Sequence, residues 1–389
     1  MSMAPFSQRL LKWFDAHGRH DLPWQEPRTP YRVWLAEIML QQTQVAAVIP
    51  YFQRFVARFP DLASLASASA DDVLQHWAGL GYYARARNLQ RAAQLIVGEH
   101  GGEFPRDIEA VTALPGIGRS TAGAVLAQAY GQRHAILDGN VKRVLARHGA
   151  IAGWPGEPKV GKQLWALSEA LLPKQRLTDY TQAIMDLGAT LCTARKPACA
   201  RCPVSADCKA FLSDRVGEFP SSRPKRERPL RHARLLLIEN AAGELLFERR
   251  PPAGIWGGLW CLPVVEGEAD EGEDPVAWVL QRHGLRVQSL ATLPSLSHAF
   301  THFELEMSPL RLRAQPAGNM LGERSELRWI NIAADDLPGL PAPVSKLLRA
   351  LNRPVPIDPQ GSLLLAEEGP TASGRVKPPK SRKQRASTP

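Results

Sequence analysis

The sequence lacks long hydrophobic runs and uses little cysteine, and each absence excludes a class of protein. No stretch approaches the roughly 18 apolar residues that a membrane-spanning helix needs, so we expect a chain that does not enter a membrane. The N-terminus has no basic segment followed by an apolar run, so we expect no secretory signal peptide and a cytoplasmic protein. Four of the five cysteines lie between residues 192 and 208, and in a cytoplasmic chain such crowding indicates metal ligation rather than disulfides.

The composition favours a multi-domain protein with an anionic partner. A chain of 389 residues is long enough for two or three domains, and a hydrophobic content of 44% supplies a sizeable core. Lys and Arg outnumber Asp and Glu by 48 to 38, which gives a net charge of +10. This excess favours a polyanion such as nucleic acid, but charge alone leaves the partner open because many basic proteins bind none.

The patterning divides the chain into a helical part and a mixed part. Residues 1–218 are predicted to be helical, because apolar residues recur there at helical spacing. The clearest segments are 10–14, 33–55, 73–77, 89–97 and 164–172. Residues 219–232 are basic and rich in proline, which is typical of a linker. Residues 233–350 predict a mixed α/β domain, and residues 351–389 a disordered basic tail. Strands are expected at 234–238, 244–247, 303–305 and 327–330.

The clustered cysteines follow the pattern C-x6-C-x2-C-x5-C; they are Cys192, Cys199, Cys202 and Cys208. Four thiolates can hold tetrahedral zinc or a [4Fe–4S] cluster. Zinc sites usually use two separated C-x2-C pairs, whereas this loop has one pair between two single ligands, which favours the cluster and leaves zinc as the alternative. The same loop carries basic side chains that could press on a phosphate backbone. These are Arg195, Lys196, Arg201 and Lys209.

A tight turn is predicted between the segments 108–113 and 120–130. Its residues are Leu114, Pro115, Gly116, Ile117 and Gly118. The glycines allow backbone N–H groups to point outward, and together with the start of the next helix these groups can bind a phosphate whatever the base sequence. An ordinary turn between two helices remains the alternative.

Two acids are candidates for catalysis. Glu37 lies on a predicted helix between Trp34 and Leu40, where burial would raise its pKa and keep it protonated, as a general acid requires. The alternative is a glutamate that reaches solvent. Asp138 lies where a helix is predicted to start, so it is either a helix cap or a carboxylate that the helix N-terminus keeps ionised. One neutral and one charged acid is the pairing that glycoside hydrolysis uses.

These motifs together resemble the helix–hairpin–helix DNA glycosylase superfamily, and within it the MutY-type adenine DNA glycosylases. The resemblance covers nearly all of residues 1–215 in family order. It rests on the cysteine loop and on residues 22–24, 37–43, 79–88, 114–118, 137–141 and 182–188. It implies an all-α helix–hairpin–helix domain with an iron–sulfur loop, and a monomer that removes adenine paired with 8-oxoguanine or guanine in double-stranded DNA.

The resemblance also implies a role for each candidate residue. Glu37 would protonate the departing adenine, while Asp138, with Asn140 beside it, would stabilise the sugar cation or trap it covalently. The adenine pocket would be lined by Leu22, Trp24 and Gln182. The residues that wedge into the base stack and hold the opposite base would be Gln42, Thr43, Leu80 and Tyr82.

Position 120 separates the activities within the superfamily. Relatives that also cut the strand carry a lysine there and form a Schiff base. This chain has Ser120, so we expect hydrolysis of the glycosidic bond alone, with Lys142 able to support at most a weak lyase activity.

The second domain resembles a Nudix hydrolase without its catalytic carboxylates. The positions of the metal-binding box hold Ala277, Trp278, Gln281 and Arg282. The fold can persist without the hydrolase chemistry, and in the MutY pattern this domain inspects the base opposite adenine. The inspecting loop is expected at Phe300, Thr301 and His302.

Three other functions fit parts of the sequence less well. A bifunctional glycosylase/lyase for oxidised pyrimidines is disfavoured by Ser120 and the second domain. A DNA-binding cluster protein without catalysis is disfavoured because Glu37 and Asp138 are both present. A nucleotide pyrophosphatase is disfavoured by the emptied Nudix box.

Overall fold

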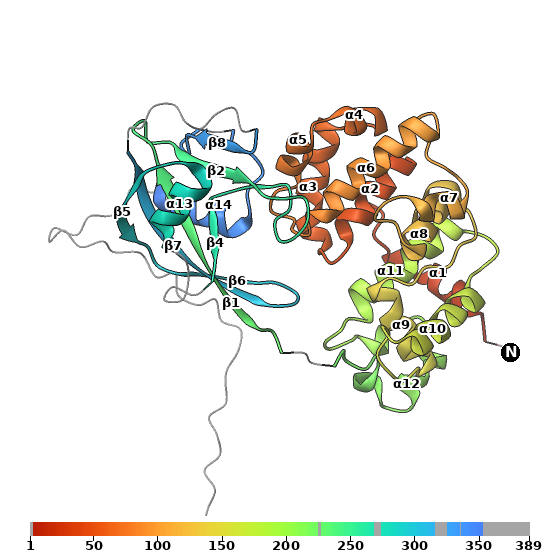
Figure 1. The fold of residues 1–389 in the computed structure, drawn as a ribbon. Coiled ribbons are helices and arrows are strands. Elements are labelled where there is room, and N and C mark those ends of the chain that lie inside the picture. Colours follow the sequence, from red (N-terminus) through yellow and green to blue (C-terminus); the bar gives the residue numbers. More distant parts are fainter. Residues whose placement is uncertain (1–2, 225–226, 268–273, 316–324, 335, 353–389) are drawn as a thin grey trace, which may run out of the picture.

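The computed structural model describes residues 3–224, 227–267, 274–315, 325–334 and 336–352, and they form a helical part followed by a sheet part (Figure 1). This is the predicted fold class. The helices of the first part are α1 (Phe6–His17), α2 (Pro30–Leu40), α3 (Val45–Arg58), α4 (Leu62–Ser67), α5 (Ala70–Trp77), α6 (Ala84–Glu99), α7 (Ile108–Ala113), α8 (Arg119–Tyr130), α9 (Gly139–Gly149), α10 (Pro158–Leu171), α11 (Leu177–Asp186) and α12 (Lys209–Leu212).

The predicted helical segments all fall on helices, and one of them contains two. The run 33–55 is divided between α2 and α3, because the chain turns at Gln42, whose backbone is left-handed with φ 61°. Thr29 caps α2: its hydroxyl accepts from the N–H of Arg32 at 3.3 Å, and Pro30 occupies the first turn.

The helical part has two hydrophobic cores, and the space between them matters for the site. One core is built on α2, α3, α5 and α6 around Trp34 and Trp77, and the other on α1, α9, α10 and α11 around Leu10 and Leu164. Helix α8 packs against both α2 and α11 and so joins the two cores. Side chains of α2 and α9 can therefore meet although the two helices are far apart in sequence.

The second part is a mixed sheet with two helices. Its strands are β1 (Leu230–Glu239), β2 (Leu245–Arg249), β3 (Trp260–Cys261), β4 (Val264–Glu266), β5 (Val287–Thr292), β6 (Leu296–Ala299), β7 (Glu304–Ala314) and β8 (Leu327–Ile330); its helices are α13 (Pro275–His283) and α14 (Ala342–Asn352). The main order is β3-β2-β1-β7-β5, in which β1 and β7 are parallel. Strand β8 has the predicted bounds.

Two predicted boundaries need correction. Strand β1 begins at Leu230, so the last three residues of the predicted linker belong to the sheet, where they pair with the start of β7. Helix α14 continues to Asn352, two residues into the predicted tail. The rest of that tail lies outside the described residues.

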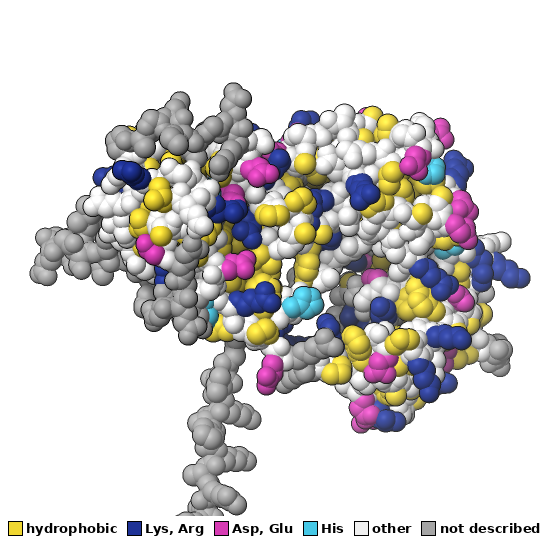
Figure 2. Space-filling view, in the orientation of Figure 1, with side chains coloured by type: hydrophobic (Ala, Val, Ile, Leu, Met, Phe, Trp, Pro, Cys, Tyr) yellow, Lys and Arg dark blue, Asp and Glu magenta, His cyan; other side chains and the backbone are white. Residues whose placement is uncertain are grey.

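The sheet part docks on α5 and α6. The Nη1 of Arg87 donates to the carbonyl of Gly257 at 2.5 Å, and Gln75 donates to the carbonyl of Leu337 at 3.2 Å. Arg249 and Asp71 form an ion pair across the same contact. The space-filling view shows a hollow where the two parts face each other, and Lys and Arg side chains over the region of α10 and α12 (Figure 2). No described helix is long and apolar enough to cross a membrane.

Candidate active site

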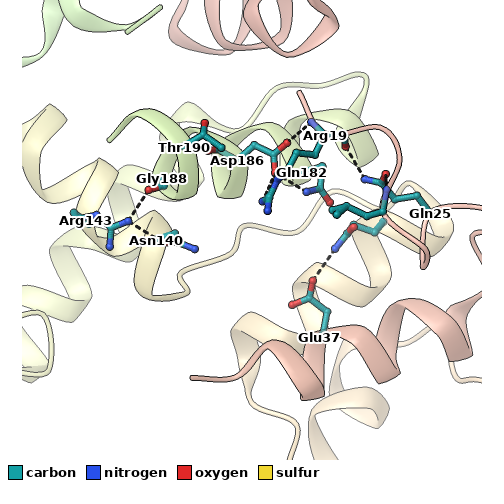
Figure 3. Close-up of polar contacts among 11 residues, drawn as sticks. Arg19, Gln25, Glu37, Asn140, Arg143, Gln182, Asp186, Gly188 and Thr190 are labelled. Atoms are coloured by element: carbon teal, nitrogen blue, oxygen red, sulfur yellow. Dashed lines mark hydrogen bonds and ion pairs between the residues drawn. The ribbon is translucent and has the colours of Figure 1, made fainter. Parts of the chain in front are cut away.

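Glu37 lies in the last turn of α2 and points into the space between the two cores (Figure 3). Its Oε1 accepts a hydrogen bond from the side-chain amide of Gln128 on α8 at 2.9 Å. Burial, and then the nearby charge of Asp138, raise the pKa of Glu37 to about 7. The direction is the one predicted from the sequence, and the half-buried side chain is held against Gln128 by this hydrogen bond.

Asp138 is the N-cap of α9, and its Oδ1 accepts from the N–H of Val141 at 2.7 Å. The capping interpretation is therefore correct. The expected pKa direction is wrong: burial raises the pKa of Asp138 in this state, although the N–H of Val141 and the charges of Arg143 and Lys142 act in the other direction. Removal of the carboxylate from water outweighs both the N–H groups of the helix N-terminus and these nearby charges.

Asn140 belongs to a hydrogen-bonded group with Arg143 and Gly188 (Figure 3), and through Arg143 this group reaches the cysteine loop. One guanidinium nitrogen of Arg143 donates to Oδ1 of Asn140 at 2.8 Å and to the carbonyl of Gly188 at 2.6 Å, and its Nε donates to the carbonyl of Cys192 at 2.7 Å. Gly188 lies in a π-helix (Leu187–Leu191), and a Cβ on it would come within 2.7 Å of Cβ of Asn140. This close packing explains why the last residue of the motif 182–188 is a glycine.

The predicted adenine-pocket residues Leu22, Trp24 and Gln182 are all buried. Trp24 packs edge-on against Phe52, with ring centroids 5.4 Å apart. The backbone N–H of Leu22 donates to the side chain of Gln25 at 3.1 Å, which fixes the loop that carries both Leu22 and Trp24.

A buried ion pair fixes Gln182. The Nε2 of Gln182 donates to Oδ1 of Asp186 at 2.7 Å, and Asp186 is fully buried. Arg19 pairs with the same carboxylate, from its side chain at 2.6 and 2.9 Å and from its backbone N–H at 2.7 Å (Figure 3). The carbonyl of Arg19 in turn accepts from Gln25 at 3.0 Å. The two sides of the pocket are thus linked through Asp186.

Two exposed side chains lie on turns whose backbone conformation is unfavourable for residues other than glycine. Gln42 and Tyr82 have φ values of 61° and 49°, in the left-handed region that residues other than glycine rarely adopt. We name the turns at 41–43 and 80–82 the two wedge loops. Thr43 is half-buried, and Leu80 is buried, so the side chain of Leu80 supports its loop from below rather than projecting from it.

The predicted phosphate-binding turn connects α7 and α8. Gly116 has φ 77°, and a Cβ there would come within 2.9 Å of Asn88. Gly118 caps α8 without a side-chain bond, and no acidic residue occupies the first turn, so its N–H groups suit an anion. The hydroxyl of Ser120 accepts from the N–H of Leu137 at 2.9 Å and so holds the segment that leads to Asp138.

The four cysteines of the loop line one mainly apolar cavity together with Val144, Leu187, Leu191 and Val204. Arg147 points into the loop: its Nη1 lies 3.4 Å from Sγ of Cys192 and donates to the carbonyl of Thr193 at 2.7 Å. Burial raises the pKa of the Cys202 thiol to about 11. A group that binds thiolates must overcome this shift, and a [4Fe–4S] cluster suits four converging sulfurs beside a buried guanidinium. The basic side chains of the loop, Arg195, Lys196, Arg201 and Lys209, are exposed.

In the sheet part, the loop predicted to inspect the base opposite adenine joins β6 to β7. We name its residues 300–302 the reading loop. Phe300 stacks on Phe303 with ring centroids 4.6 Å apart, and Thr301 and His302 are exposed at the tip. The hydroxyl of Tyr82 lies 3.5 Å from that of Thr301, so the reading loop reaches a wedge loop. On α13, where a Nudix hydrolase carries metal-binding glutamates, Arg282 pairs with Glu248 at 2.5 Å.

Sequence reasoning missed the supporting residues. Gln128, Asp186, Arg19, Gln25 and Arg85 all contact predicted site residues or the loops that carry them. The one signal in the sequence was that Asp186, Gln25 and Arg85 lie within or beside the family motifs. Their partners are distant in sequence, so no local pattern marks the contacts.

Three family profiles match the chain: "HhH-GPD superfamily base excision DNA repair protein" over residues 35–170, "Iron-sulfur binding domain of endonuclease III" over 192–208, and "NUDIX domain" over 234–350. The adenine DNA glycosylase of Buchnera aphidicola subsp. Acyrthosiphon pisum (strain APS) is 36% identical over 348 residues, which cover 90% of this chain and 98% of that protein. The adenine DNA glycosylase of Homo sapiens is 37% identical over 357 residues, which cover 77% of this chain and 65% of that one. Among solved structures, a thermostable thymine-DNA glycosylase aligns with a TM-score of 0.49 at 28% identity, over 54% of this chain and 95% of that chain.

Proposed function

The chain belongs to the MutY-type adenine DNA glycosylases and is a [4Fe–4S] DNA N-glycosylase of base excision repair, and from this we propose that it removes adenine paired with 8-oxoguanine or guanine by hydrolysis alone. It would act as a monomer on chromosomal DNA in the nucleoid. The observation that carries the proposal is the pair of acids between the two helical cores, because Glu37 is available as a proton donor at neutral pH beside Asp138.

The chemistry follows from the roles of the two acids. A base inside a duplex is out of reach, so the adenosine must first leave the stack, at a cost of roughly a few kcal/mol. Glu37 then gives its proton to a ring nitrogen of adenine as the bond between that base and the sugar breaks, and the bond electrons leave with the base. Such proton donation contributes ~10²–10⁴-fold.

The sugar cation left behind is stabilised by Asp138. As an ionised carboxylate, Asp138 faces the positive charge or bonds to it, and water then adds to the sugar carbon and loses a proton to Glu37. Burial raises the pKa of Asp138 in the DNA-free state. The growing positive charge of the sugar would reverse this effect, because an adjacent cation favours the ionised form.

Adenine is selected through the orientation of Gln182. Because its amide nitrogen donates to Asp186, its oxygen is the end left to face an incoming base. A carbonyl oxygen accepts from the exocyclic amine of adenine and repels the carbonyl that guanine carries at the same position. Leu22 and Trp24 supply the apolar walls of this pocket.

The opposite base is read from both parts of the chain. Gln42 and Tyr82 would fill the gap that adenine leaves, and base–aromatic stacking contributes roughly 1–3 kcal/mol per base. Thr301 can donate to or accept from 8-oxoguanine, whose 8-oxo oxygen and N7–H distinguish it from guanine. The contact between Tyr82 and Thr301 supports this shared reading.

The cysteine loop would hold the cluster through its four sulfurs and present its basic side chains to the DNA backbone. When bound, the cluster supplies a rigid anchor for the loop. The residues of this chain do the rest: Arg147 neutralises part of the thiolate charge, and Arg143 connects the loop to Asn140. The turn at 114–118 would bind a second phosphate.

A single assay tests the proposal. Duplexes with adenine opposite 8-oxoguanine, guanine, cytosine and thymine are incubated with the enzyme under single-turnover conditions, with and without later alkali. We expect excision opposite 8-oxoguanine and guanine, and strand cleavage only after alkali. Efficient borohydride trapping of an enzyme–DNA adduct, or equal rates on all four duplexes, would contradict it.

A further inference from the structure

The side chain of Arg85, in the first turn of α6, donates several hydrogen bonds to groups that lie outside its own helix. Its side chain is buried, with the residue 9% exposed. One terminal nitrogen donates to the carbonyls of Ile38, Met39 and Gln41, at 3.0, 2.8 and 2.6 Å. The other donates to the hydroxyl of Thr43 and the carbonyls of Leu80 and Gly81, at 3.3, 3.1 and 3.1 Å. We name Arg85 and these six acceptors the Arg85 clamp.

The clamp holds both wedge loops at once. In the first loop, its acceptors on Gln41 and Thr43 flank the exposed Gln42. In the second, its acceptors on Leu80 and Gly81 come directly before the exposed Tyr82. Each loop contains a left-handed residue that is not glycine, a conformation that persists only where the surroundings enforce it. A planar guanidinium with several donors in a fixed geometry can enforce both loops together.

The Arg85 clamp also caps the C-terminal end of α2, the helix that carries Glu37. The carbonyls of Ile38 and Met39 are among the last four of α2, which lack the regular partner four residues on, and that of Ile38 also accepts from the N–H of Gln41 at 3.4 Å. A cation at a helix C-terminus is favourable because the carbonyl dipoles point toward it. The guanidinium carbon also lies 5.4 Å from the ring centre of Trp77 and 5.5 Å from that of Tyr82. Burial lowers the pKa of Arg85 only to about 10, so the charge persists at neutral pH.

We propose that Arg85 is a positioning residue that sets the separation of Gln42 and Tyr82 before DNA binds. The proposal rests on the wedge roles given under the proposed function. Its physical basis is preorganisation: loops held in the wedging geometry lose little entropy when the base stack opens, whereas free loops would have to be ordered at that moment. Arg85 itself touches no reacting atom.

The test is a double-mutant cycle in the full-length protein. Arg85→Lys keeps the charge, but its single nitrogen cannot span both loops. Single-turnover excision of adenine opposite 8-oxoguanine is measured for wild type, Arg85→Lys, the double variant Gln42→Ala/Tyr82→Ala, and the triple variant. Arg91→Lys, at an exposed position of the same helix, is the matched control. Thermal unfolding of each variant establishes that it is folded at the assay temperature.

We expect Arg85→Lys to slow excision by on the order of 10- to 100-fold in the wild-type background, and by less than about 3-fold where the wedges are already absent. Arg91→Lys should leave the rate unchanged. An equal reduction in both backgrounds would overturn the clamp, because Arg85 would then act elsewhere. If the double alanine variant itself excises adenine at the wild-type rate, the wedge roles fail first, and the clamp proposal fails with them.

If the Arg85→Lys variant does not fold, hydrogen exchange on the wild-type protein tests the proposal instead. A shared clamp requires that the hydrogen-bonded backbone amides of the two wedge loops, that of Thr43 on the carbonyl of Leu40 and that of Leu80 on the carbonyl of Trp77, become exchangeable in one common opening step. We expect matching opening free energies for the two loops. Independent opening of the loops would overturn the proposal.

Discussion

The Nε2 of Gln182 lies 2.7 Å from Oδ1 of Asp186, a carboxylate with no exposure to solvent that is also paired with Arg19. An ionised carboxylate only accepts hydrogen bonds, so this contact fixes which end of the Gln182 amide faces the pocket. Under the proposed function, the preference for adenine therefore depends on a residue that need not touch the base.

Asp186→Asn should reduce the preference for the exocyclic amine of adenine. The new amide can accept or donate, so Gln182 is no longer held in one orientation. The measurement is the ratio of single-turnover excision rates for adenine and for unsubstituted purine, which lacks the amine. One neutral hydrogen bond contributes roughly 0.5–1.5 kcal/mol, so we expect the ratio to fall by about 2- to 10-fold relative to wild type.

The control for this change is Asp179→Asn, on the exposed side of the same helix, where Asp179 pairs with Arg176. It should leave the ratio as it is in wild type. A slower Asp186→Asn enzyme with an unaltered ratio would mean that Asp186 only stabilises the fold.

Glu37→Gln should abolish adenine release while duplex binding persists, because the amide cannot donate a proton to the leaving base. For the wild type, the acid must be protonated, so excision at saturating enzyme should decline as the pH rises through about 7, the pKa to which burial raises Glu37. Cleavage by the variant at a rate near wild type would rule out this assignment.

The raised pKa of Glu37 also predicts how the stability of the folded protein changes with pH. The folded pKa of about 7 lies above the ordinary value of 4.5, so the native state binds the extra proton, and stability falls as the pH rises from about 4.5 to 7. The decrease amounts to at most roughly 3 to 4 kcal/mol. Glu37→Gln should remove it, so the difference in unfolding free energy between pH 5 and pH 8 should be smaller in the variant. A pH dependence identical to wild type would exclude Glu37 as its source.

Cys202→Ser should lower the iron content well below the about four atoms per chain that a [4Fe–4S] cluster requires. Without its anchor the loop changes shape, so DNA binding should weaken, and the slope of log affinity against log salt should become shallower by about one for each phosphate that the loop no longer reaches. Cys261→Ala is the control, since Cys261 is buried in the sheet part, away from the loop. Zinc in place of iron in anaerobically purified wild-type protein would refute the cluster.

Thr301→Val should lower the preference for 8-oxoguanine over guanine by a modest factor. It removes the hydroxyl at nearly constant volume, and a neutral hydrogen bond contributes roughly 0.5–1.5 kcal/mol, which corresponds to about 2- to 10-fold. The ratio of excision rates opposite the two bases, at fixed salt, is the measurement. Thr292→Val, at an exposed position on β5, should leave that ratio intact. If Thr301→Val does so too, the hydroxyl does not read the lesion.

The sequence by itself determined the features that depend on neighbours along the chain. Helical periodicity placed α1, α2, α3, α5, α6 and α10, the glycines of 114–118 placed the turn, and the cysteine spacing placed the cluster ligands, because each of these requires only residues within a few turns of one another. The order of motifs along the chain was specific enough to indicate the family.

Only the tertiary structure decided how those features act together. Helix α8 brings Glu37 near Asp138 and supplies Gln128, a partner 91 residues away in sequence. Burial is a property of the assembled cores, which is why the pKa of Asp138 shifts opposite to the direction inferred from its helix start. The two wedge loops are far apart in sequence, and a single guanidinium holds both. No local pattern encodes a contact of this kind, because its donors and acceptors meet only when the two loops pack on the same side chain.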